Sequence, residues 1–210
     1  MLFLYAMKLK KMIEKGLITF HISFDDKKID ELLLYLLELE KWNKRMNLVG
    51  LKDMDSIVKE LLFDAFFIHG YVRGSRNLMD FGSGSGIIAI PLAILTPEIE
   101  IFSVDKSLKK IQFQRHIKRI LHLRGFTPVR GRFEALEPLG VESITVKGFG
   151  NIQEILDKGK KHLTGKGTIF ILKGKRASSI EHEGFSMEAE IPYTLPMNDK
   201  AYRLFIYKKR

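Results

Sequence analysis

Hydrophobic positions in the first third of the chain recur at the spacing of helices. The segment DDKKIDELLLYLLELEKWNKRMNLV (residues 25–49) opens with two aspartates, which are favoured N-cap residues, and then carries apolar residues at helical spacing. The segment MDSIVKELLFDAFFIHGYV (54–72) predicts a second helix in the same way. RGSRN (73–77) follows as a joint. We therefore predict an N-terminal helical region over residues 1–74.

After this region, short apolar runs alternate with helical stretches, which predicts an α/β domain over residues 75–210. Two late runs, EAEIPY (188–193) and RLFIYKK (203–209), are joined by a loop alone and predict a closing antiparallel hairpin. The rest of the sheet would be mainly parallel, with helices on both of its faces. Its strands are expected at 77–81, 99–105, 126–130, 143–149 and 167–174, and helices at 107–123 and 151–163.

The stretch NLMDFGSGSGIIAIPLAI (77–94) places an acid and three glycines between the first strand and a helix expected to begin near Gly86. Gly82, Gly84 and Gly86 weaken any regular element, which indicates that something close to the backbone needs the space. Helix N-termini offer free N–H donors, and ligands of open α/β sheets bind at the carboxyl ends of the strands. Nineteen residues after Gly86 the second strand ends at Asp105, where an acid can accept hydrogen bonds from the two hydroxyls of a ribose.

Three interpretations of this loop compete. A dinucleotide fold has the spacing G-x-G-x-x-G; this loop is one residue shorter, and Asp80 would lie poorly against a pyrophosphate. S-adenosylmethionine (SAM) has no phosphate and carries a sulfonium and an amine, so an acid at the strand end suits its methionine portion. The third interpretation is a connector without a ligand, with Asp105 beside a helix N-cap. The preceding and following acids, together with the strand–helix context, favour SAM.

The charge of the chain indicates which kind of molecule it binds. The chain has 35 Lys and Arg against 25 Asp and Glu, and its net charge of +10 favours nucleic acid or an anionic membrane face. Residues 106–132 hold nine basic residues and no acid, and residues 158–176 hold seven more, again without an acid. A solvated lysine-rich surface would explain each segment alone. Around one candidate SAM site, the segments together favour RNA or DNA.

Composition excludes several other chemistries. The absence of cysteine excludes disulfides, thiolate nucleophiles and Cys-based zinc sites, and the six histidines show no metal spacing, so no metal is expected. The apolar runs are far shorter than the roughly 20 residues that span a bilayer, and the N-terminus has the reverse order of a secretory signal. We therefore expect a cytoplasmic protein without a membrane partner. Asp64, in an apolar helix, is either a buried structural acid or part of a substrate face, and Trp42 is expected in the core.

Five segments carry a resemblance to a known family. EKWNKRMNLVG (40–50) resembles a K-W-N-x-x-x-N-L signature, and LMDFGSGSGIIAIPLAI (78–94) resembles an I-D-x-G-x-G-x-G-x-P-G-I-P-L-A-I segment. SVDKSLKKIQFQRHI (103–117), PVRGRFEAL (128–136) and TIFILKGK (168–175) match further segments, so the resemblance covers about residues 36–209. Together they resemble the RsmG (GidB) family of bacterial 16S rRNA guanine-N7 methyltransferases. This implies a class I SAM-dependent methyltransferase fold, Rossmann-like with a mostly parallel seven-stranded sheet, a terminal antiparallel hairpin and an N-terminal helical extension.

The resemblance also implies roles for individual residues. Gly82 and Ile87 would line the SAM pocket, and Asp80, Gly84 and Gly86 would shape it. Asp105 would face the ribose, and Phe133 and Glu134 would lie beside the adenine. Lys147 would lie near both cofactor and target base, as the catalytic residue and a cofactor ligand. The residues expected to bind RNA are Asn43, Asn47, Lys109, Lys110, Lys173, Lys175 and Arg203. The implied partner is 16S rRNA or the small ribosomal subunit, and the implied state is a monomer.

Departures from the family pattern leave two other functions open. Lys147 stands where the family has an arginine, so the charge is kept and the planar bidentate contact is lost. Ile88 and Ala89 replace a proline–glycine pair, and KELLFDAF (59–66) keeps Asp64 but lacks the family's preceding histidine. A non-catalytic rRNA-binding assembly factor on a methyltransferase fold, or a methyltransferase with a different acceptor, are the alternatives.

Overall fold

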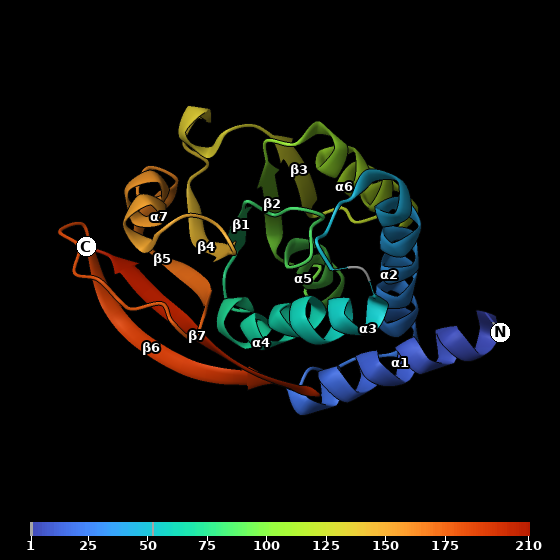
Figure 1. Ribbon diagram of the computed structural model, residues 1–210. Coiled ribbons are helices and arrows are strands. Elements are labelled where there is room, and N and C mark those ends of the chain that lie inside the picture. The colour runs from blue at the N-terminus through green and yellow to red at the C-terminus, as the bar shows by residue number, and fades with distance from the viewer. Residues whose placement is uncertain (1, 52) are drawn as a thin grey trace.

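The computed structural model describes residues 2–51 and 53–210, which form a sheet enclosed by helices (Figure 1). The helices are α1 (Leu2–Thr19), α2 (Asp26–Met46), α3 (Met54–Ile57), α4 (Phe63–Val72), α5 (Ala89–Leu95), α6 (Leu108–Ile120) and α7 (Ile152–Gly159), with a π-helical segment η1 (Val58–Leu62) and a 3-10 turn η2 (Phe133–Ala135). The strands are β1 (Asn77–Phe81), β2 (Glu100–Asp105), β3 (Phe126–Arg130), β4 (Val141–Lys147), β5 (Leu163–Gly174), β6 (Phe185–Leu195) and β7 (Asn198–Lys209).

The sheet has seven strands in the order β3-β2-β1-β4-β5-β7-β6. The first five strands run parallel, and β7 pairs antiparallel with both β5 and β6. The chain moves outward from β1 to β3 and then returns to the other side of β1 with β4. Such a reversal creates the crevice in which open α/β sheets bind ligands. The predicted parallel sheet with a closing hairpin is confirmed.

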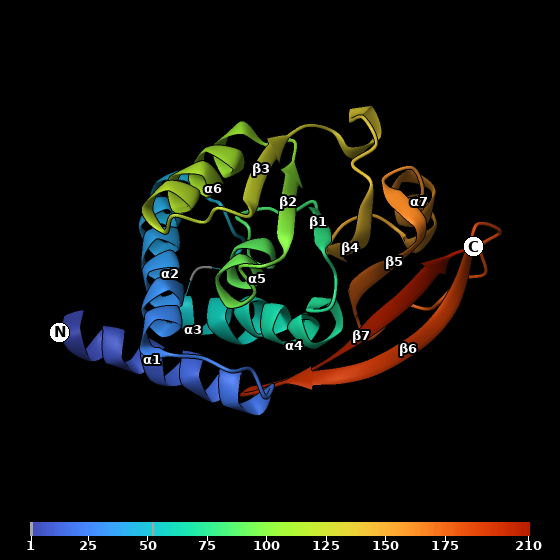
Figure 2. The same ribbon diagram turned by 180° about the vertical axis from the view of Figure 1, so that it is seen from behind.

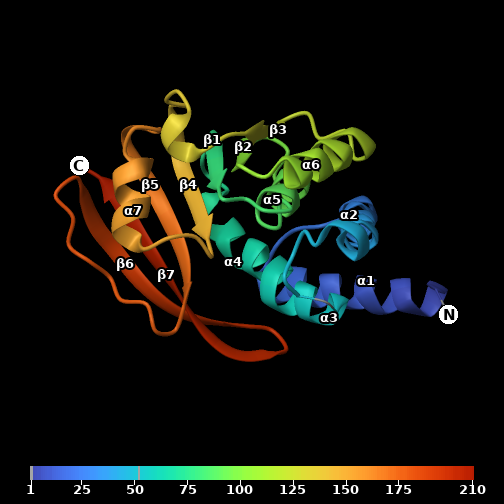
Figure 3. The same ribbon diagram turned by 45° about the horizontal axis from the view of Figure 1, so that its top comes forward.

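Helices cover both faces of the sheet, as predicted, but unequally (Figures 2 and 3). Successive residues of a strand point to opposite faces. Leu78 of β1 therefore joins a large core formed with α1, α2, α4, α5 and α6, whereas Met79 joins a smaller core with α7. On β5, Phe170 and Leu172 face the large core while Ile169 and Ile171 face the small one. The N-terminal helices thus share one continuous core with the sheet.

The N-terminal helices have the caps that their sequence predicts. The side chain of Asp25 accepts a hydrogen bond from the Lys28 N–H at 2.8 Å at the start of α2. Asn47 ends that helix in the left-handed conformation, at φ 48°. Trp42 packs partly buried against the large core, 5.5 Å from the ring of Phe113. No helix in the described part of the chain is both long enough and apolar enough to cross a membrane.

Several element boundaries differ from the sequence-based expectation; β4, for example, covers residues 141–147 in place of 143–149. The helix expected near Gly86 begins at Ala89, because three glycines with positive φ turn the chain up to residue 86. The single helix expected over residues 54–72 contains the π-helical segment η1, whose residues keep the apolar pattern of an α-helix. The hairpin strands are 11 and 12 residues long, longer than the two apolar runs that predicted them.

Candidate active site

A cavity of about 490 Å³ opens at the carboxyl ends of β1, β2 and β4. This is the edge of the sheet at which the strand order reverses, and ligands of this class of fold bind there. The cavity is bounded by the loops after these strands, by η2 and by α7. Its lining residues are Phe81, Gly82, Val104, Asp105, Lys106, Ser107, Lys110, Gly131, Arg132, Phe133, Glu134, Lys147, Gly148, Phe149, Glu154 and Lys158.

The glycine-rich turn forms the floor of this edge because only glycine fits its backbone. Gly82 lines the cavity at φ +69°, and a Cβ there would lie 3.5 Å from the side chain of Phe149. Gly86 has φ +76°, and a Cβ would approach the Ile90 side chain to 2.6 Å. The turn is fastened from below, because Gln114 donates hydrogen bonds to Ser83 Oγ and Gly84 O at 2.9 and 2.7 Å. Ile87, expected to line the cavity, packs instead against the large core.

Asp80, at the end of β1 beside the glycine turn, has a buried carboxylate with one free oxygen. Oδ1 accepts a hydrogen bond from Thr145 Oγ1 at 3.1 Å, while Oδ2 is buried without a hydrogen-bond partner in the protein. Burial raises the pKa of Asp80 from 3.8 to about 7, and the negative charge of Asp105 adds to this effect. A buried acid with an unused oxygen is suited to a cationic ligand, such as the methionine portion of SAM.

Asp105 ends β2 and joins the glycine turn to the next helix. Its Oδ2 accepts a hydrogen bond from the Gly84 N–H at 3.0 Å, and its Oδ1 accepts one from the Ser107 N–H at 2.8 Å. Lys110 Nζ lies 3.8 Å from Oδ2. A carboxylate has about four lone-pair sites, so Asp105 keeps capacity for a ribose hydroxyl at the cavity wall.

Aromatic rings form the wall opposite the acids. Phe81 and Phe133 stack with ring centroids 3.6 Å apart, and Phe149 meets Phe81 edge-on at 4.5 Å. Glu134 follows at the more exposed rim, 3.8 Å from Lys158 Nζ. The Phe133 ring is 1% exposed and stacks on His162 as well, with centroids 4.6 Å apart, so contact of Phe133 and Glu134 with an adenine stays a prediction.

Lys147 lines the cavity from the end of β4, and its ammonium is held by the N-terminal helices. Its Nζ donates a hydrogen bond to the Glu60 carbonyl at 2.7 Å and lies 2.5 Å from Asp64 Oδ2. The second contact is an ion pair between the ammonium and a buried carboxylate. Tyr193 donates a hydrogen bond to Asp64 Oδ1 at 2.7 Å. Asp64 is thus a buried acid outside the cavity that contacts Lys147 of the cavity wall.

Most of the side chains expected to bind RNA make contacts within the chain. Asn43 caps the end of α2 by accepting from the Leu48 and Val49 N–H groups, and Lys109 donates to the Met46 and Asn47 carbonyls at 2.6 and 3.2 Å. These contacts give Asn43, Asn47 and Lys109 a structural part in joining α2 to α6.

The other four residues expected to bind RNA have different surroundings. Lys110 lies at the cavity, and Lys173 donates to the Phe149 and Gly150 carbonyls at 2.5 and 2.6 Å. Arg203 pairs across the hairpin with Glu190. Lys175 is exposed, without an ion pair or hydrogen bond in the described part of the chain. RNA binding by all seven stays a prediction.

Sequence reasoning missed several residues of the cavity lining, among them Phe149 and Lys158. Phe149 lies between Gly148 and Gly150, which have φ +66° and +46°, and Lys158 Nζ lies 6.0 Å from the centre of its ring. The pattern K-G-F-G-N directly after a strand was the available signal, because glycines on both sides of one aromatic residue let it turn over a site. Lys158 belonged to a basic segment whose role was assigned to RNA alone.

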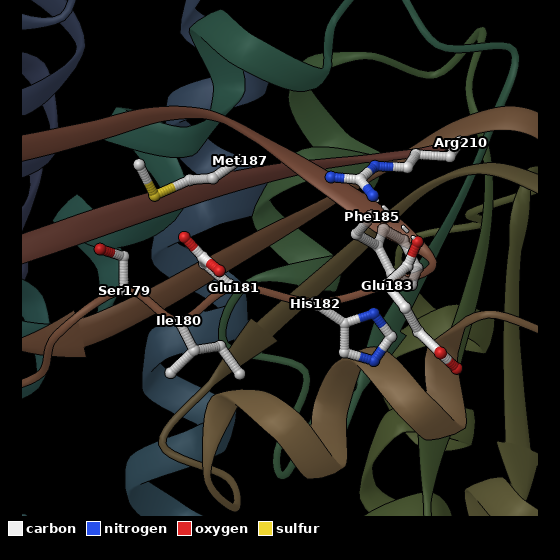
Figure 4. A pocket seen from close by; sticks show the side chains of 8 residues that line it. All are labelled: Ser179, Ile180, Glu181, His182, Glu183, Phe185, Met187 and Arg210. Carbon is white, nitrogen blue, oxygen red and sulfur yellow. Dashed lines mark hydrogen bonds between the residues drawn. The ribbon is translucent and has the colours of Figure 1, made fainter.

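A second cavity, of about 730 Å³, lies at the hairpin edge of the sheet (Figure 4). It is larger than the first but contains none of the predicted site residues. His182 has both ring nitrogens engaged, by Asp157 at 2.9 Å and by the Gly184 N–H at 3.0 Å, and therefore fastens the loop before β6. We assign the chemistry to the first cavity, where the acids and glycines converge. Among residues 2–51 and 53–210, no three acidic or histidine side chains are placed to hold a metal ion.

Comparisons with known proteins identify the family to which the chain belongs. The model of the family described as GidB, rRNA small subunit methyltransferase G, matches residues 28–199. A protein of Syntrophotalea carbinolica named ribosomal RNA small subunit methyltransferase G is 28% identical over 96% of this chain and 99% of its own. One of the same name from Geobacter sp. is 33% identical over 83% of this chain and 82% of its own.

A solved structure supports the fold. TrmK of M. capricolum, in complex with S-adenosylhomocysteine, superimposes with a TM-score of 0.57 at 16% identity, over 70% of this chain and 68% of that one. At this identity the likeness concerns the fold, which is that of class I SAM-dependent methyltransferases. Since the family model spans most of the sequence and the relatives align over nearly their whole length, the chain belongs to the rRNA small subunit methyltransferase G family.

Proposed function

We propose that this SAM-dependent rRNA methyltransferase transfers its methyl group to N7 of a guanine in the 530-loop region of 16S rRNA. The observation that carries the proposal is the cavity at the reversal of the strand order, in a chain of this family. Its acids, glycines and aromatic wall are the residues expected to hold SAM. A cytoplasmic, monomeric enzyme acting on the small subunit or its free rRNA is part of the proposal.

Residues at and beside the cavity fit two parts of SAM. Asp80 is buried and directly precedes the lining residues Phe81 and Gly82, and its unpartnered oxygen suits the cationic methionine end. The Asp105 carboxylate suits the ribose hydroxyls, and Phe133 and Glu134 of the lining are the residues proposed to lie beside the adenine. Gly82 and its turn leave room for the ligand beside the backbone. When bound, SAM supplies a methyl group already activated by the sulfonium.

The chemistry of guanine N7 asks little of the protein's side chains. N7 carries a lone pair and no proton, so no general base is needed. Catalysis then depends on alignment of N7, the methyl carbon and the sulfur. Lys147 contributes a fixed positive charge beside this line, for the base or for the carboxylate of SAM. The lysine keeps the charge of the family's arginine, and the Glu60 carbonyl and Asp64 supply the fixed geometry that a single ammonium lacks.

The mouth of the cavity suits a nucleic acid. Lys106, Lys110, Arg132 and Lys158 are among the lining residues, where Lys110 lies 3.8 Å from Asp105 and Lys158 pairs with Glu154 at 2.6 Å. Cations at this cavity attract phosphates and make binding depend on salt. A neutral small-molecule acceptor would gain nothing from these charges, and a protein acceptor would need acidic residues to match them. The basic mouth therefore favours RNA over the alternative acceptors.

Methyl transfer with radiolabelled SAM tests the proposal. Purified protein is incubated with 16S rRNA or small subunits from a strain that lacks this methylation, and with 23S rRNA as the control acceptor. Incorporation into 16S rRNA alone is expected. SAM binding without incorporation would point to a different acceptor, and failure to bind SAM would favour a non-catalytic assembly factor.

A further inference from the structure

Groups far apart in the sequence hold the ammonium of Lys147. The Glu60 carbonyl belongs to η1, where the chain leaves the regular α-helical hydrogen-bond pattern. Asp64 belongs to the first turn of α4 and is 1% exposed. Both lie on the N-terminal helices, whereas Lys147 ends a strand of the sheet. The lysine's position at the cavity therefore depends on how α4 packs.

Asp64 is itself held by the C-terminal hairpin. The hydroxyl of Tyr193 in β6, 129 residues away in sequence, donates a hydrogen bond to Asp64 Oδ1 at 2.7 Å. Burial and the neighbouring Asp64 carboxylate raise the pKa of Tyr193 above its usual range, so the hydroxyl stays a donor. Because Oδ1 is occupied by Tyr193, Oδ2 is the oxygen that faces Lys147.

The ring of Tyr193 has little freedom to move. It stacks on Phe67 of α4 with centroids 3.9 Å apart and an interplanar angle of 12°, and on Tyr202 of β7 at 5.4 Å. A second contact fastens the hairpin to η1, because Lys200 Nζ of β7 lies 2.7 Å from Glu60 Oε1. The hairpin thus contacts both residues that hold Lys147.

A purely structural interpretation would assign this arrangement to packing alone. Two features argue against it. The contacts that run from Tyr193 through Asp64 end at the ammonium of Lys147, which lines the cofactor cavity. The Lys147 side chain is 20% exposed, whereas Asp64 is buried. A buried carboxylate needs a partner, and one placed only for stability could lie anywhere in the core.

We propose that Asp64 and Tyr193 are positioning residues that hold the Lys147 ammonium at the wall of the cofactor cavity. The C-terminal hairpin then acts on methyl transfer through this lysine. The inference rests on the proposed function and assigns a role in it to residues outside the cavity.

The variant Tyr193→Phe tests the inference with little change in packing. It removes the hydroxyl and keeps the ring that stacks on Phe67 and Tyr202. Tyr207→Phe is the matched control, because Tyr207 is a buried residue of the same hairpin whose hydroxyl contacts only the Ile180 backbone. Both variants lose one buried hydroxyl, so both are expected to lower the melting temperature similarly. Only Tyr193→Phe is expected to lower kcat, by about tenfold, as for one hydrogen bond to a charged group.

A double-mutant cycle separates a positioning role from a structural one. If Tyr193 acts through Lys147, Tyr193→Phe has no further effect on kcat in a Lys147→Ala protein. Because Lys147→Ala leaves Asp64 buried without its cation, the cycle is repeated in the neutral background Asp64→Asn with Lys147→Ala. If Tyr193→Phe lowers kcat in either background by the same factor as in the wild type, the inference is wrong.

The outcomes also separate this inference from the proposed function. An active wild type with an equally active Tyr193→Phe variant would contradict the inference alone. A wild type that binds SAM and leaves 16S rRNA unmethylated would contradict the proposed function, and this inference with it.

Discussion

At the scale of single residues, Asp80 lowers the stability of the free protein at a position that suits the cofactor. Its carboxylate is buried with one oxygen unpaired, and burial raises its pKa to about 7. Near neutral pH the folded protein therefore holds a group that is costly to ionise. A cationic ligand would supply the missing partner and favour the ionised form. The residue thus weakens the free protein and is expected to strengthen its complex with SAM.

This opposition predicts a pH dependence of stability. The folded state binds the Asp80 proton more tightly than the unfolded state, whose pKa is near 3.8. The Asp80 contribution to the free energy of unfolding is therefore full below about pH 4 and is lost as the pH rises through about 7. The difference of about three pH units corresponds to up to about 4 kcal/mol.

The variant Asp80→Asn removes this titration. Relative to the wild type, its stability is expected to fall less between about pH 4 and pH 7, and its affinity for SAM to decrease about tenfold or more because the negative charge is gone. Urea unfolding across this pH range, together with titration calorimetry, measures both quantities. Equal pH slopes in the two proteins would show that Asp80 does not titrate as described.

At the scale of single residues, the sequence predicted the functional residues whose structural partners lie near them in the sequence. The acids and glycines between residues 80 and 105 could be assigned because a strand end, a turn and a helix start follow one another there. The partners of Lys147 could not be predicted, since Glu60 and Asp64 precede it by more than 80 residues. Asp64 was left between two roles because its partner Tyr193 lies 129 residues away in the sequence.

The scale of the element is illustrated by the loop after β4, which carries Phe149 over the cavity. Lys173 of β5 fastens this loop through the Phe149 and Gly150 carbonyls. Burial lowers the pKa of Lys173, as expected for an ammonium that is partly withdrawn from water. Lys173 is therefore a structural support of the loop, in addition to its expected contact with RNA.

The variant Lys173→Met is expected to loosen this loop. It keeps the apolar stem and removes both hydrogen bonds, so the affinity for SAM should fall by about threefold to tenfold. Hydrogen exchange of the amides over residues 148–151 should quicken. Lys175→Met is the matched control, because it removes the same charge from an exposed residue two positions later. A drop in SAM affinity for both variants, or for neither, would contradict this role.

The elements were predicted well where apolar runs are short and bounded by turns. Strands β1 and β3 have the expected residues, because glycine and polar residues delimit them. The π-helical segment η1 escaped prediction, since its five residues continue the apolar spacing of the helices beside it. The hairpin was underestimated because its strands are partly exposed and alternate in polarity beyond the two apolar runs.

At the scale of the whole molecule, the shared core explains how distant segments can build one site. The N-terminal helices pack on one face of the sheet, against side chains of β1, β5 and β7. Through this packing α4 meets the hairpin near the cavity. Helical and sheet regions could be separated along the sequence, but composition and periodicity carry no information on this packing. The basic excess was visible in the sequence, and the structure adds that Lys106, Lys110, Arg132 and Lys158 line the cavity.

The position of the transferred methyl group tests the central claim most directly. Small-subunit rRNA from a strain lacking this methylation is incubated with the protein and SAM, and the chain is then cleaved at 7-methylguanine. One new cleavage in the 530-loop region is expected, and a lower yield of the same cleavage with Lys147→Ala. A methyl group on another atom, another nucleotide or another molecule would contradict the account.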